Sequence, residues 1–482
     1  MYLGLDIGTS GVKALMIDAN QKTIATADAA LDVTRAHSGW SEQNPNDWIE
    51  ATKKAIGSLR NSHGKQLAGI KGIGLSGQMH GATLLDGADN ILRPCILWND
   101  VRSHEEAALL DDNPAFRKIS GNIVFPGFTA PKLVWAKNNE PEIFEQVAKV
   151  LLPKDFLRLW LCGEYVTDPS DASGTAWFDV ADRTWSHKLL DASGMHIEQM
   201  PQVREGSDIS GTLRRKLSQE WGMNSDVVIA GGGGDNAASA VGMGIIDKGS
   251  AFISLGTSGV MFAANEHYLP NPDSAVHAFC HALPQRWHQM GVILSATDAL
   301  NWFAGICASD AETLSNNLGT ELNKPSRVSF LPYLSGERTP HNDAAIRGNF
   351  IGLGHEDDQV SLTQAIMEGV GFAFRDNMNA LKAAGTSIDQ VTAVGGGANS
   401  QYWLKAISTI LNIPINVPVD GDFGAAFGAA RLGILAAENS APSDVCTAPT
   451  IAHTIEPDKI LTDAFNHAYQ KYTGIYPAIK GL

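Results

Sequence analysis

Residues 4–13 read GLDIGTSGVK, and residues 254–260, far along the same chain, read SLGTSGV. In both stretches the five residues GTSGV directly follow an apolar run that is typical of a β-strand. The repetition indicates that the chain contains two related units. A glycine-rich turn between two strands leaves several backbone N–H groups without ladder partners, so each copy can hold phosphate oxygens.

The elements around the first copy predict a mixed α/β unit. Residues 2–30 predict a three-stranded meander, and residues 70–77 predict a further strand. Between them, Asn44 is a suitable N-cap and Pro45 a suitable first residue for a helix.

Related elements surround the second copy. A strand–turn–strand is followed by a long helix from about Ser361 to Gly385, for which Ser361 and Gln364 predict a capping box. A strand, the glycines at 395–397 and another helix then follow in sequence.

Two helices rich in small residues also form a pair. GDNAASAVGMGII begins at Gly234, and GDFGAAFGAARLGIL begins at Gly421. Small residues four positions apart in both helices allow close approach to another backbone. We therefore predict two α/β domains that face each other, at residues 1–246 and 247–482.

Composition disfavours some classes of partner and indicates the compartment. The formal net charge is −16 over 482 residues, which disfavours nucleic acid and anionic membrane surfaces as partners. The five cysteines include no CxxC pair, which favours free thiols in a reducing compartment. No apolar run is long enough for a membrane span, and no leader pattern precedes the first strand. These features predict a soluble cytoplasmic protein.

Two facing turns can clamp a polyphosphate from both sides. Thr9, Ser10 and Thr257 add hydroxyl donors to the backbone groups, and Asp6, just before the first turn, can hold Mg²⁺ directly or through water. The chain contains no GxxxxGK[ST] motif, which excludes a P-loop protein. A GxGxxG pattern at residues 72–77 is followed by a turn and a strand rather than a helix, so we discount a dinucleotide fold.

Asp235 follows four glycines at the predicted junction of a strand and a helix. An aspartate there is a favoured N-cap. The glycines also let a ligand approach the backbone, and phosphoryl transfer to an alcohol needs a carboxylate that accepts the hydroxyl proton. The residue types leave both roles open.

Polar side chains beside other strands are candidates for binding the hydroxyl groups of a sugar. They are His80 in GQMHG and Asp100 and Arg102 in WNDVR, although the last two can also pair with each other. The loop LSGERTPH at residues 334–341 is a candidate wall of the cleft or a solvated connection. The three histidines at 277, 281 and 288 match no convincing zinc arrangement, because Pro284 and strand-like flanks argue against a helix, and we expect structural histidines.

Taken in order, these motifs resemble those of the FGGY carbohydrate kinases, which belong to the actin-like and hexokinase-like ATPases. The motifs that carry the resemblance are GLDIGTSGVK, GQMHG, WNDVR, GGGDNAA, SLGTSGV, PYLSGERTPH and VGGGANS. Met79–His80 and the run at 98–100 resemble the xylulose branch. Val101, where relatives often have glycine, and the additional Gly231 depart from the family pattern.

The resemblance implies two ribonuclease-H-like domains around a cleft, and transfer of phosphate from ATP to D-xylulose with Mg²⁺. It implies that Asp235 is the catalytic base, with Asp6 and Asp235 near Mg²⁺. It also implies a homodimer. Expected sugar-binding residues are Met79, His80, Asp100, Arg102, Asp235 and Asn236. Expected ATP-binding residues are Thr9, Ser10, Lys13, Gly256, Thr257, Gly395, Gly396 and Asn399.

Three alternatives compete with this reading. A kinase of the same family can act on another ketose or polyol, such as ribulose. An actin-type or chaperone-type ATPase would use the same nucleotide clamp to act on a protein partner, but the sequence shows no added peptide-binding or polymerising segment. A nicotinamide oxidoreductase would rest only on Gly72, Gly74 and Gly77.

Overall fold

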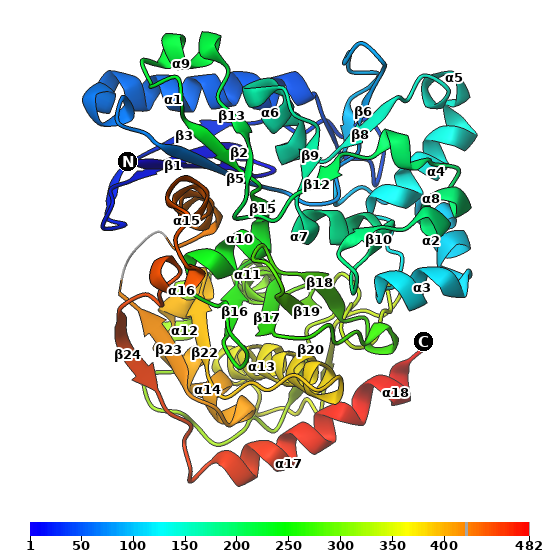
Figure 1. Ribbon diagram of the computed structural model, residues 1–482. Helices are drawn as coiled ribbons and strands as arrows, with labels where there is room; N and C mark the ends of the chain where they lie inside the picture. The colour runs from blue at the N-terminus through cyan, green and yellow to red at the C-terminus, as the bar shows by residue number, and fades with distance from the viewer. Residues whose placement is uncertain (420–422, 482) are drawn as a thin grey trace.

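The structure is a computed structural model that describes residues 1–419 and 423–481. Two mixed β-sheets form two lobes, one above the other in Figure 1, and helices lie between and around them. This is the two-domain α/β architecture that the sequence predicts.

The N-terminal sheet has seven strands, six of which follow one path while β15 pairs with β5 beside it. The predicted meander and the strand that follows its helix are both present. In spatial order the strands are β13 (Ile209–Thr212), β14 (Val228–Ala230), β5 (Gly72–Gly77), β1 (Tyr2–Ile7), β2 (Gly11–Ile17) and β3 (Thr23–Ala30), with β15 (Gly233–Gly234) on β5.

The C-terminal sheet repeats this topology. β16 pairs antiparallel with β17 and parallel with β22, just as β1 pairs with β2 and β5. Its seven strands in order are β18 (His277–Cys280), β19 (Trp287–Ile293), β17 (Gly259–Asn265), β16 (Ala251–Leu255), β22 (Val391–Val394), β23 (Ile415–Pro418) and β24 (Ile451–Ile455). The two GTSGV turns therefore occupy the same place in two copies of one sheet.

Each sheet is covered on its inner face by a helix from the other half of the chain. α15 (Ala425–Glu438) packs with Tyr2 and Leu15 of the N-terminal sheet. α10 (Asp235–Gly242) packs with Phe252 and Phe262 of the C-terminal sheet. The two helices lie together between the lobes (Figure 1). The predicted start of the second helix at Gly421 lies outside the described residues.

Small residues permit this packing, as the sequence predicts. A Cβ atom added to Gly428 of α15 would lie 1.7 Å from the carbonyl oxygen of Ala238 in α10. One added to Gly74 of β5 would lie 1.7 Å from the carbonyl oxygen of Ala429. The GxGxxG pattern at 72–77 is thus part of a strand on which a helix backbone rests directly.

The outer faces carry the longer helices. The N-terminal sheet packs against α1 (Pro45–Leu67) and α6 (Pro153–Cys162), with α9 (Arg215–Trp221) beside them. Asn44 caps α1 and Pro45 begins it, as predicted. The C-terminal sheet packs against helices that include α11 (Thr297–Ile306), α12 (Ala311–Asn316), α13 (Gln359–Ala383), α14 (Gln401–Leu411), α17 (Thr462–Thr473) and α18 (Ile475–Ile479), while the short α16 (Pro442–Val445) packs beside α15.

The predicted cap of the long C-terminal helix is wrong by one turn. α13 begins at Gln359, and the side chain of Asp358 accepts a hydrogen bond from the N–H of Ser361. The hydroxyl oxygen of Ser361 accepts a hydrogen bond from the N–H of Asp358 in return. Ser361 is therefore the third helical residue rather than the cap. Because aspartate and serine are both favoured N-caps, spacing alone does not separate the two registers.

An insertion between β5 and β13 forms much of the upper right of Figure 1. Its helices are α2 (His104–Asp111), α3 (Pro114–Ser120), α4 (Thr129–Asn139), α5 (Pro141–Phe144), α6, α7 (Pro169–Ala172) and α8 (His187–Ala192), with the short 3₁₀ turn η1 (Ser173–Thr175). Its short strands include β6 (Thr83–Leu85), β8 (Lys149–Leu151), β10 (Phe178–Asp179) and β11 (Thr184–Trp185). One hydrophobic cluster joins this insertion to β18 of the other lobe.

His277 and His288 lie in strands β18 and β19, and His281 lies in the turn between them, so none of the three lies in a helix. Within residues 1–419 and 423–481, no helix combines the length and apolar character needed to cross a bilayer.

Candidate active site

Asp235 lies where three parallel strands end. Strands β1, β5 and β15 run in the same direction, and the register places Asp6 of β1 and Gly233 of β15 on either side of Ser76. Since β15 ends at Gly234, Asp235 becomes the first residue of α10. Asp6 and Asp235 therefore belong to the same edge of the N-terminal sheet.

The carboxyl group of Asp235 has the properties of a general base. It accepts hydrogen bonds from the backbone N–H and the side-chain amide of Asn236, at 2.7 and 3.0 Å. Burial raises its pKa to about 6, and the two bonds from Asn236 oppose that rise. A base that is ionised at pH 7 but has a pKa close to it is well suited to accept a hydroxyl proton.

Met79 connects the Asp235 region to the insertion. A Cβ atom added to Gly234 would lie 2.9 Å from the sulfur of Met79, so the thioether packs against the residue that precedes Asp235. On its other side, the methyl group of Met79 lies against Gly174. The structure thus brings Met79, His80 and Asp235 into one region.

His80 has a left-handed backbone, with φ of 70°, and an imidazole ring that is held in one orientation. Its Nδ1 lies 2.7 Å from the carbonyl oxygen of Gly174, and its ring stacks on Phe128 with centroids 4.7 Å apart. Because a carbonyl oxygen only accepts, Nδ1 carries the proton and Nε2 is an acceptor. Burial lowers the pKa of His80 to about 3, so the ring is neutral.

A cavity of about 320 Å³ opens beside His80 between the two halves of the chain. The N-terminal half supplies aromatic and polar groups, and the C-terminal half supplies the loop that the sequence suggested as a wall. The lining includes His80, Trp98, Asn99, Asp100, Phe125, Phe128, Glu337, Arg338 and Asn342.

Arg338 is a component of this cavity that sequence reasoning did not select as a binding residue. Its guanidinium carbon lies 4.4 Å from the centroid of Phe125, a position that presents a cation and its N–H donors at the cavity wall. Beside it, burial raises the pKa of Glu337 to about 8. The motif GERTPH was the sequence feature that pointed to this loop, but its residue types did not show which of its side chains faces the cleft.

Asp100 and Arg102 make the mutual pair that the sequence left open as an alternative. Arg102 donates to both carboxylate oxygens of Asp100, at 2.9 and 2.6 Å, and to Glu42 at 2.7 Å. Its guanidinium carbon lies 3.5 Å from the ring centroid of Trp40. Asp100 still lines the cavity, but most of the hydrogen-bonding capacity of the pair is occupied within the protein. Their role toward a sugar stays a prediction.

The first GTSGV turn is tied to the sugar-side residues. The Thr9 hydroxyl donates to Gln78 at 3.1 Å and accepts from the indole of Trp98 at 3.0 Å. Ser10 is exposed at the tip, and Lys13 stands opposite Asp6 in the β1–β2 register. Thr9 therefore orients Trp98 at the mouth of the cavity in addition to any contact with phosphate.

The second turn is tied to α11. The carbonyl of Gly256 accepts bonds from the N–H and the hydroxyl of Thr297, at 3.0 and 2.8 Å, and Ala296 donates to the carbonyl of Thr257. With its carbonyl groups directed to the helix, the turn leaves Thr257 and Ser258 exposed at its tip.

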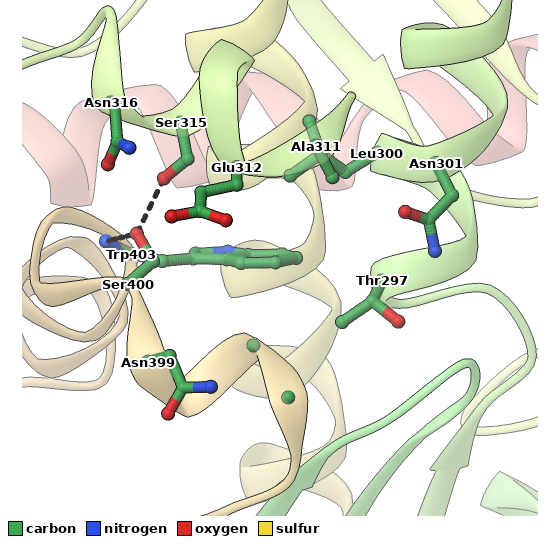
Figure 2. Close-up of a pocket in the computed structure, with 12 residues that line it drawn as sticks. Thr297, Leu300, Asn301, Ala311, Glu312, Ser315, Asn316, Asn399, Ser400 and Trp403 are labelled. Atoms are coloured by element: carbon green, nitrogen blue, oxygen red, sulfur yellow. Dashed lines mark hydrogen bonds between the residues drawn. The ribbon is translucent and has the colours of Figure 1, made fainter. Parts of the chain in front are cut away.

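A second cavity, of about 440 Å³, lies beside this turn in the C-terminal lobe. Figure 2 shows Asn399, Ser400 and Trp403 on one side and Glu312, Ser315 and Asn316 of α12 on the other. Gly396, from the predicted adenosine-side loop, also lines it, and Gly395 has φ of 91° directly before. Thr297 of α11 lines this cavity and also donates to the carbonyl of Gly256, so the cavity adjoins the second turn.

Comparison with protein families identifies both halves. The N-terminal domain model of the FGGY family of carbohydrate kinases matches residues 1–242, and the C-terminal domain model matches residues 251–437. The chain belongs to the FGGY family of carbohydrate kinases. As a member of this family it is a carbohydrate kinase with the two-domain fold described above.

Individual FGGY relatives are similar over nearly the whole chain. Xylulose kinase of Escherichia coli is 48% identical over 441 residues, which cover 91% of this chain and 90% of the relative. Xylulose kinase of Bacillus subtilis is 32% identical, with coverage of 100% and 99%. A crystal structure of a xyloylose kinase from Brucella ovis superposes with a TM-score of 0.98 at 61% identity, with 99% of each chain covered.

Proposed function

We propose that this FGGY kinase transfers the γ-phosphoryl group of ATP to the primary hydroxyl of D-xylulose and forms D-xylulose 5-phosphate. The observation that carries the proposal is the place of Asp235, which follows β15 at the same sheet edge as Asp6 and adjoins Gly234 and Met79, with a pKa that burial raises to about 6. The 48% identity to a xylulose kinase supports D-xylulose as the acceptor. A homodimer stays a prediction from the family resemblance.

In this proposal Asp235 orients the sugar hydroxyl and accepts its proton while the new bond to phosphorus forms. Asn236 fixes the carboxylate through two hydrogen bonds. Met79 and His80 bind the sugar, with the unprotonated Nε2 of His80 accepting from a sugar hydroxyl. Asp100 and Arg102 support the cavity wall near the same sugar.

The two turns hold the nucleotide phosphates from opposite lobes, with Thr9, Ser10 and Lys13 on one side and Gly256 and Thr257 on the other. Backbone N–H groups at such turns suit phosphate oxygens because they are fixed before the ligand arrives. The adenosine occupies the cavity of about 440 Å³, beside Gly395, Gly396 and Asn399.

The residues present fit a magnesium ion. Asp6 and Asp235 offer carboxylate oxygens at one sheet edge. Mg²⁺ in kinases is usually held by one or two carboxylates together with substrate phosphates and several waters. When bound, it neutralises charge that develops on the transferring group.

A panel of ketoses and polyols tests the acceptor. Formation of ADP is followed in a coupled assay with saturating MgATP, and kcat/KM is measured for D-xylulose, ribulose and related polyols. D-Xylulose is expected to have the highest value. A higher value for ribulose would assign the enzyme to another acceptor within the family, and ATP turnover indifferent to every sugar would favour an ATPase that acts on a protein partner.

A further inference from the structure

A cluster of fully buried charged and hydroxyl side chains lies behind the glycine loop that carries Asp235. The cluster joins α6 and α7 to residues 231–234, and none of its members is assigned a role in the proposed reaction. Each member has a solvent exposure of 0%: Lys154, Asp155, Arg158, Asp168, Ser170 and Asp171.

Lys154 is the centre of this cluster. Its ammonium group lies 2.6 Å from Asp155, 2.8 Å from Asp168 and 3.0 Å from Asp171. Burial alone would lower the pKa of Lys154, but the three carboxyl groups outweigh it and hold that pKa above its usual range. The ammonium group therefore stays charged beside Asp168.

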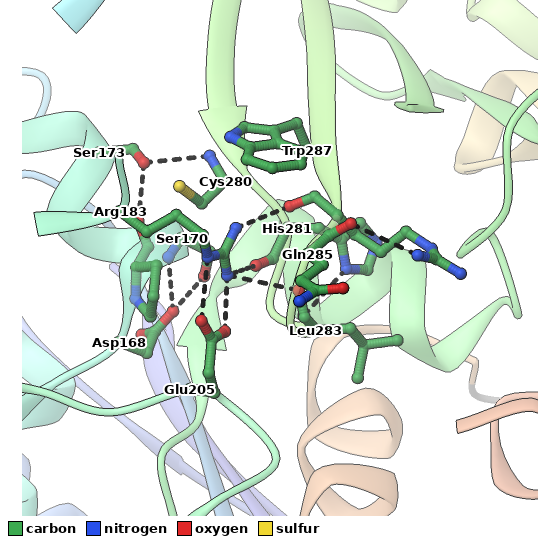
Figure 3. Close-up of polar contacts among 12 residues, drawn as sticks. Asp168, Ser170, Ser173, Arg183, Glu205, Cys280, His281, Leu283, Gln285 and Trp287 are labelled. Atoms are coloured by element: carbon green, nitrogen blue, oxygen red, sulfur yellow. Dashed lines mark hydrogen bonds and ion pairs between the residues drawn. The ribbon is translucent and has the colours of Figure 1, made fainter. Parts of the chain in front are cut away.

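From Asp168 a directed chain of hydrogen bonds runs to the loop. The Ser170 hydroxyl donates to Asp168, an interaction drawn in Figure 3. A hydroxyl has one proton, so only lone pairs of the Ser170 oxygen remain for other partners. That oxygen accepts the backbone N–H of Gly234 at 3.1 Å.

Gly234 is the residue directly before Asp235, and it is held from two sides. Ser170 fixes its N–H, and Met79 packs against its Cα. At the start of the same loop, Arg158 donates to the carbonyl oxygen of Gly231. The loop that leads into Asp235 is thus held by side chains from α6 and α7, at the carbonyl of Gly231 and at the N–H of Gly234.

We propose that Ser170 is a positioning residue for phosphoryl transfer, which holds the Gly234 peptide so that Asp235 meets the sugar hydroxyl. This inference rests on the proposed function of Asp235. In this proposal Ser170 acts through the N–H of Gly234, while its own hydroxyl is held by Asp168. Since a misplacement of about 1 Å can reduce a rate about 100-fold, loss of this bond should reduce kcat more than it reduces binding.

A matched pair of serines makes the test sharp. Ser173 is as fully buried as Ser170 and is three residues away. Its hydroxyl oxygen accepts the N–H of Cys280 (Figure 3), and its hydroxyl donates to the carbonyl of Pro169. Ser170→Ala and Ser173→Ala therefore remove similar groups, only one of which touches the loop. Ser170→Cys, which fills the space with a poor acceptor, is a second variant.

For each variant, kcat and KM are measured with the best sugar of the panel, and calorimetry gives the dissociation constants of ADP and sugar. Ser170→Ala and Ser170→Cys are expected to lower kcat by about 10- to 100-fold, with both dissociation constants within about twofold of wild type. Ser173→Ala is expected to keep kcat within about threefold of wild type, even if its melting temperature falls as far as that of Ser170→Ala.

Two outcomes would overturn the inference. One is a folded Ser170 variant whose kcat matches that of Ser173→Ala. The other is a loss that falls on ligand binding rather than on kcat. A fully active Asp235→Asn enzyme would instead refute the assignment of Asp235 as the base, whatever Ser170→Ala shows. Failure of the proposed function and failure of the Ser170 inference can therefore be told apart.

Discussion

At the scale of the residue, Asp235 shows how position sets chemistry. The first turn of a helix favours a carboxylate because of the exposed N–H groups there, whereas burial favours the protonated acid. Burial prevails, and the pKa rises from 3.8 to about 6. The group is still mainly ionised at neutral pH, and it holds a proton more readily than an exposed aspartate does.

This balance predicts the pH dependence of the reaction. A base must be unprotonated to accept a proton, so kcat/KM for the sugar should be level near pH 7.5 and fall about tenfold per pH unit well below pH 6. Steady-state rates between pH 5 and 8 at saturating MgATP measure the profile. Asp235→Asn should lower kcat by about 10²- to 10⁴-fold across that range.

Glu337 provides the control, because it lines the sugar cavity and burial raises its pKa to about 8. Glu337→Gln should leave the fall below pH 6 in place, whatever it does to the rest of the profile. If Glu337→Gln abolished the acidic limb while Asp235→Asn kept it, the base would be misassigned.

The sequence predicted the residue types at the site better than it predicted their partners. GQMHG and GGGDNAA indicated Met79, His80 and Asp235, and the fold brings these together. WNDVR offered the pair of Asp100 and Arg102 as one option, but it could not show that Arg102 also contacts Glu42 and Trp40, because those two residues come from a distant part of the chain. Ser170 had no signal at all, since its role depends on a glycine 64 residues away.

At the scale of the element, glycines determine how closely helices approach. α15 rests on β5 and α10 through positions where any side chain would meet a backbone atom, including Gly74 and Gly428. Spacing of small residues predicted this contact. It could not predict that α15 covers the sheet of the other lobe, because a small-residue face does not specify its partner.

Gly428→Ala should therefore destabilise the enzyme. The added Cβ atom would lie 1.7 Å from the carbonyl oxygen of Ala238, and two packed helices must separate to accept it. Overpacking of this kind costs about 1–3 kcal/mol. We expect a lower melting temperature in calorimetry and a lower kcat, because α10 carries Asp235 at its first residue.

Gly57→Ala in α1 is the matched control. Nothing lies within 4 Å of a Cβ atom added there, so the helix should gain about 0.5–1 kcal/mol from the exchange of glycine for alanine. Equal melting temperatures for the two variants would show that the contact between α10 and α15 adapts without cost.

At the scale of the whole molecule, one short repeated turn anticipated a duplicated sheet. The repeat was readable because both copies kept the same five residues. The insertion after β5 was not predictable in the same way, since the repeated turn carries no information about it and it packs partly on β18 of the other lobe. The boundary at residues 246 and 247 stays a prediction, and α10 and α15 show that each half of the chain supplies a helix to the other lobe.

Two matched turns on opposite lobes predict that a triphosphate protects both at once. Hydrogen exchange at residues 8–12 and 256–260 should slow together when a non-hydrolysable ATP analogue, Mg²⁺ and D-xylulose are present, because their N–H groups then bind phosphate oxygens. Helix α9, at the top of the N-terminal lobe in Figure 1, should exchange at an unchanged rate. ADP alone should protect the second turn more than the first, since the adenosine-side cavity adjoins only the second. Protection of neither turn by the analogue would mean that the phosphates bind elsewhere, and the duplicated GTSGV would then serve only to close two β-hairpins.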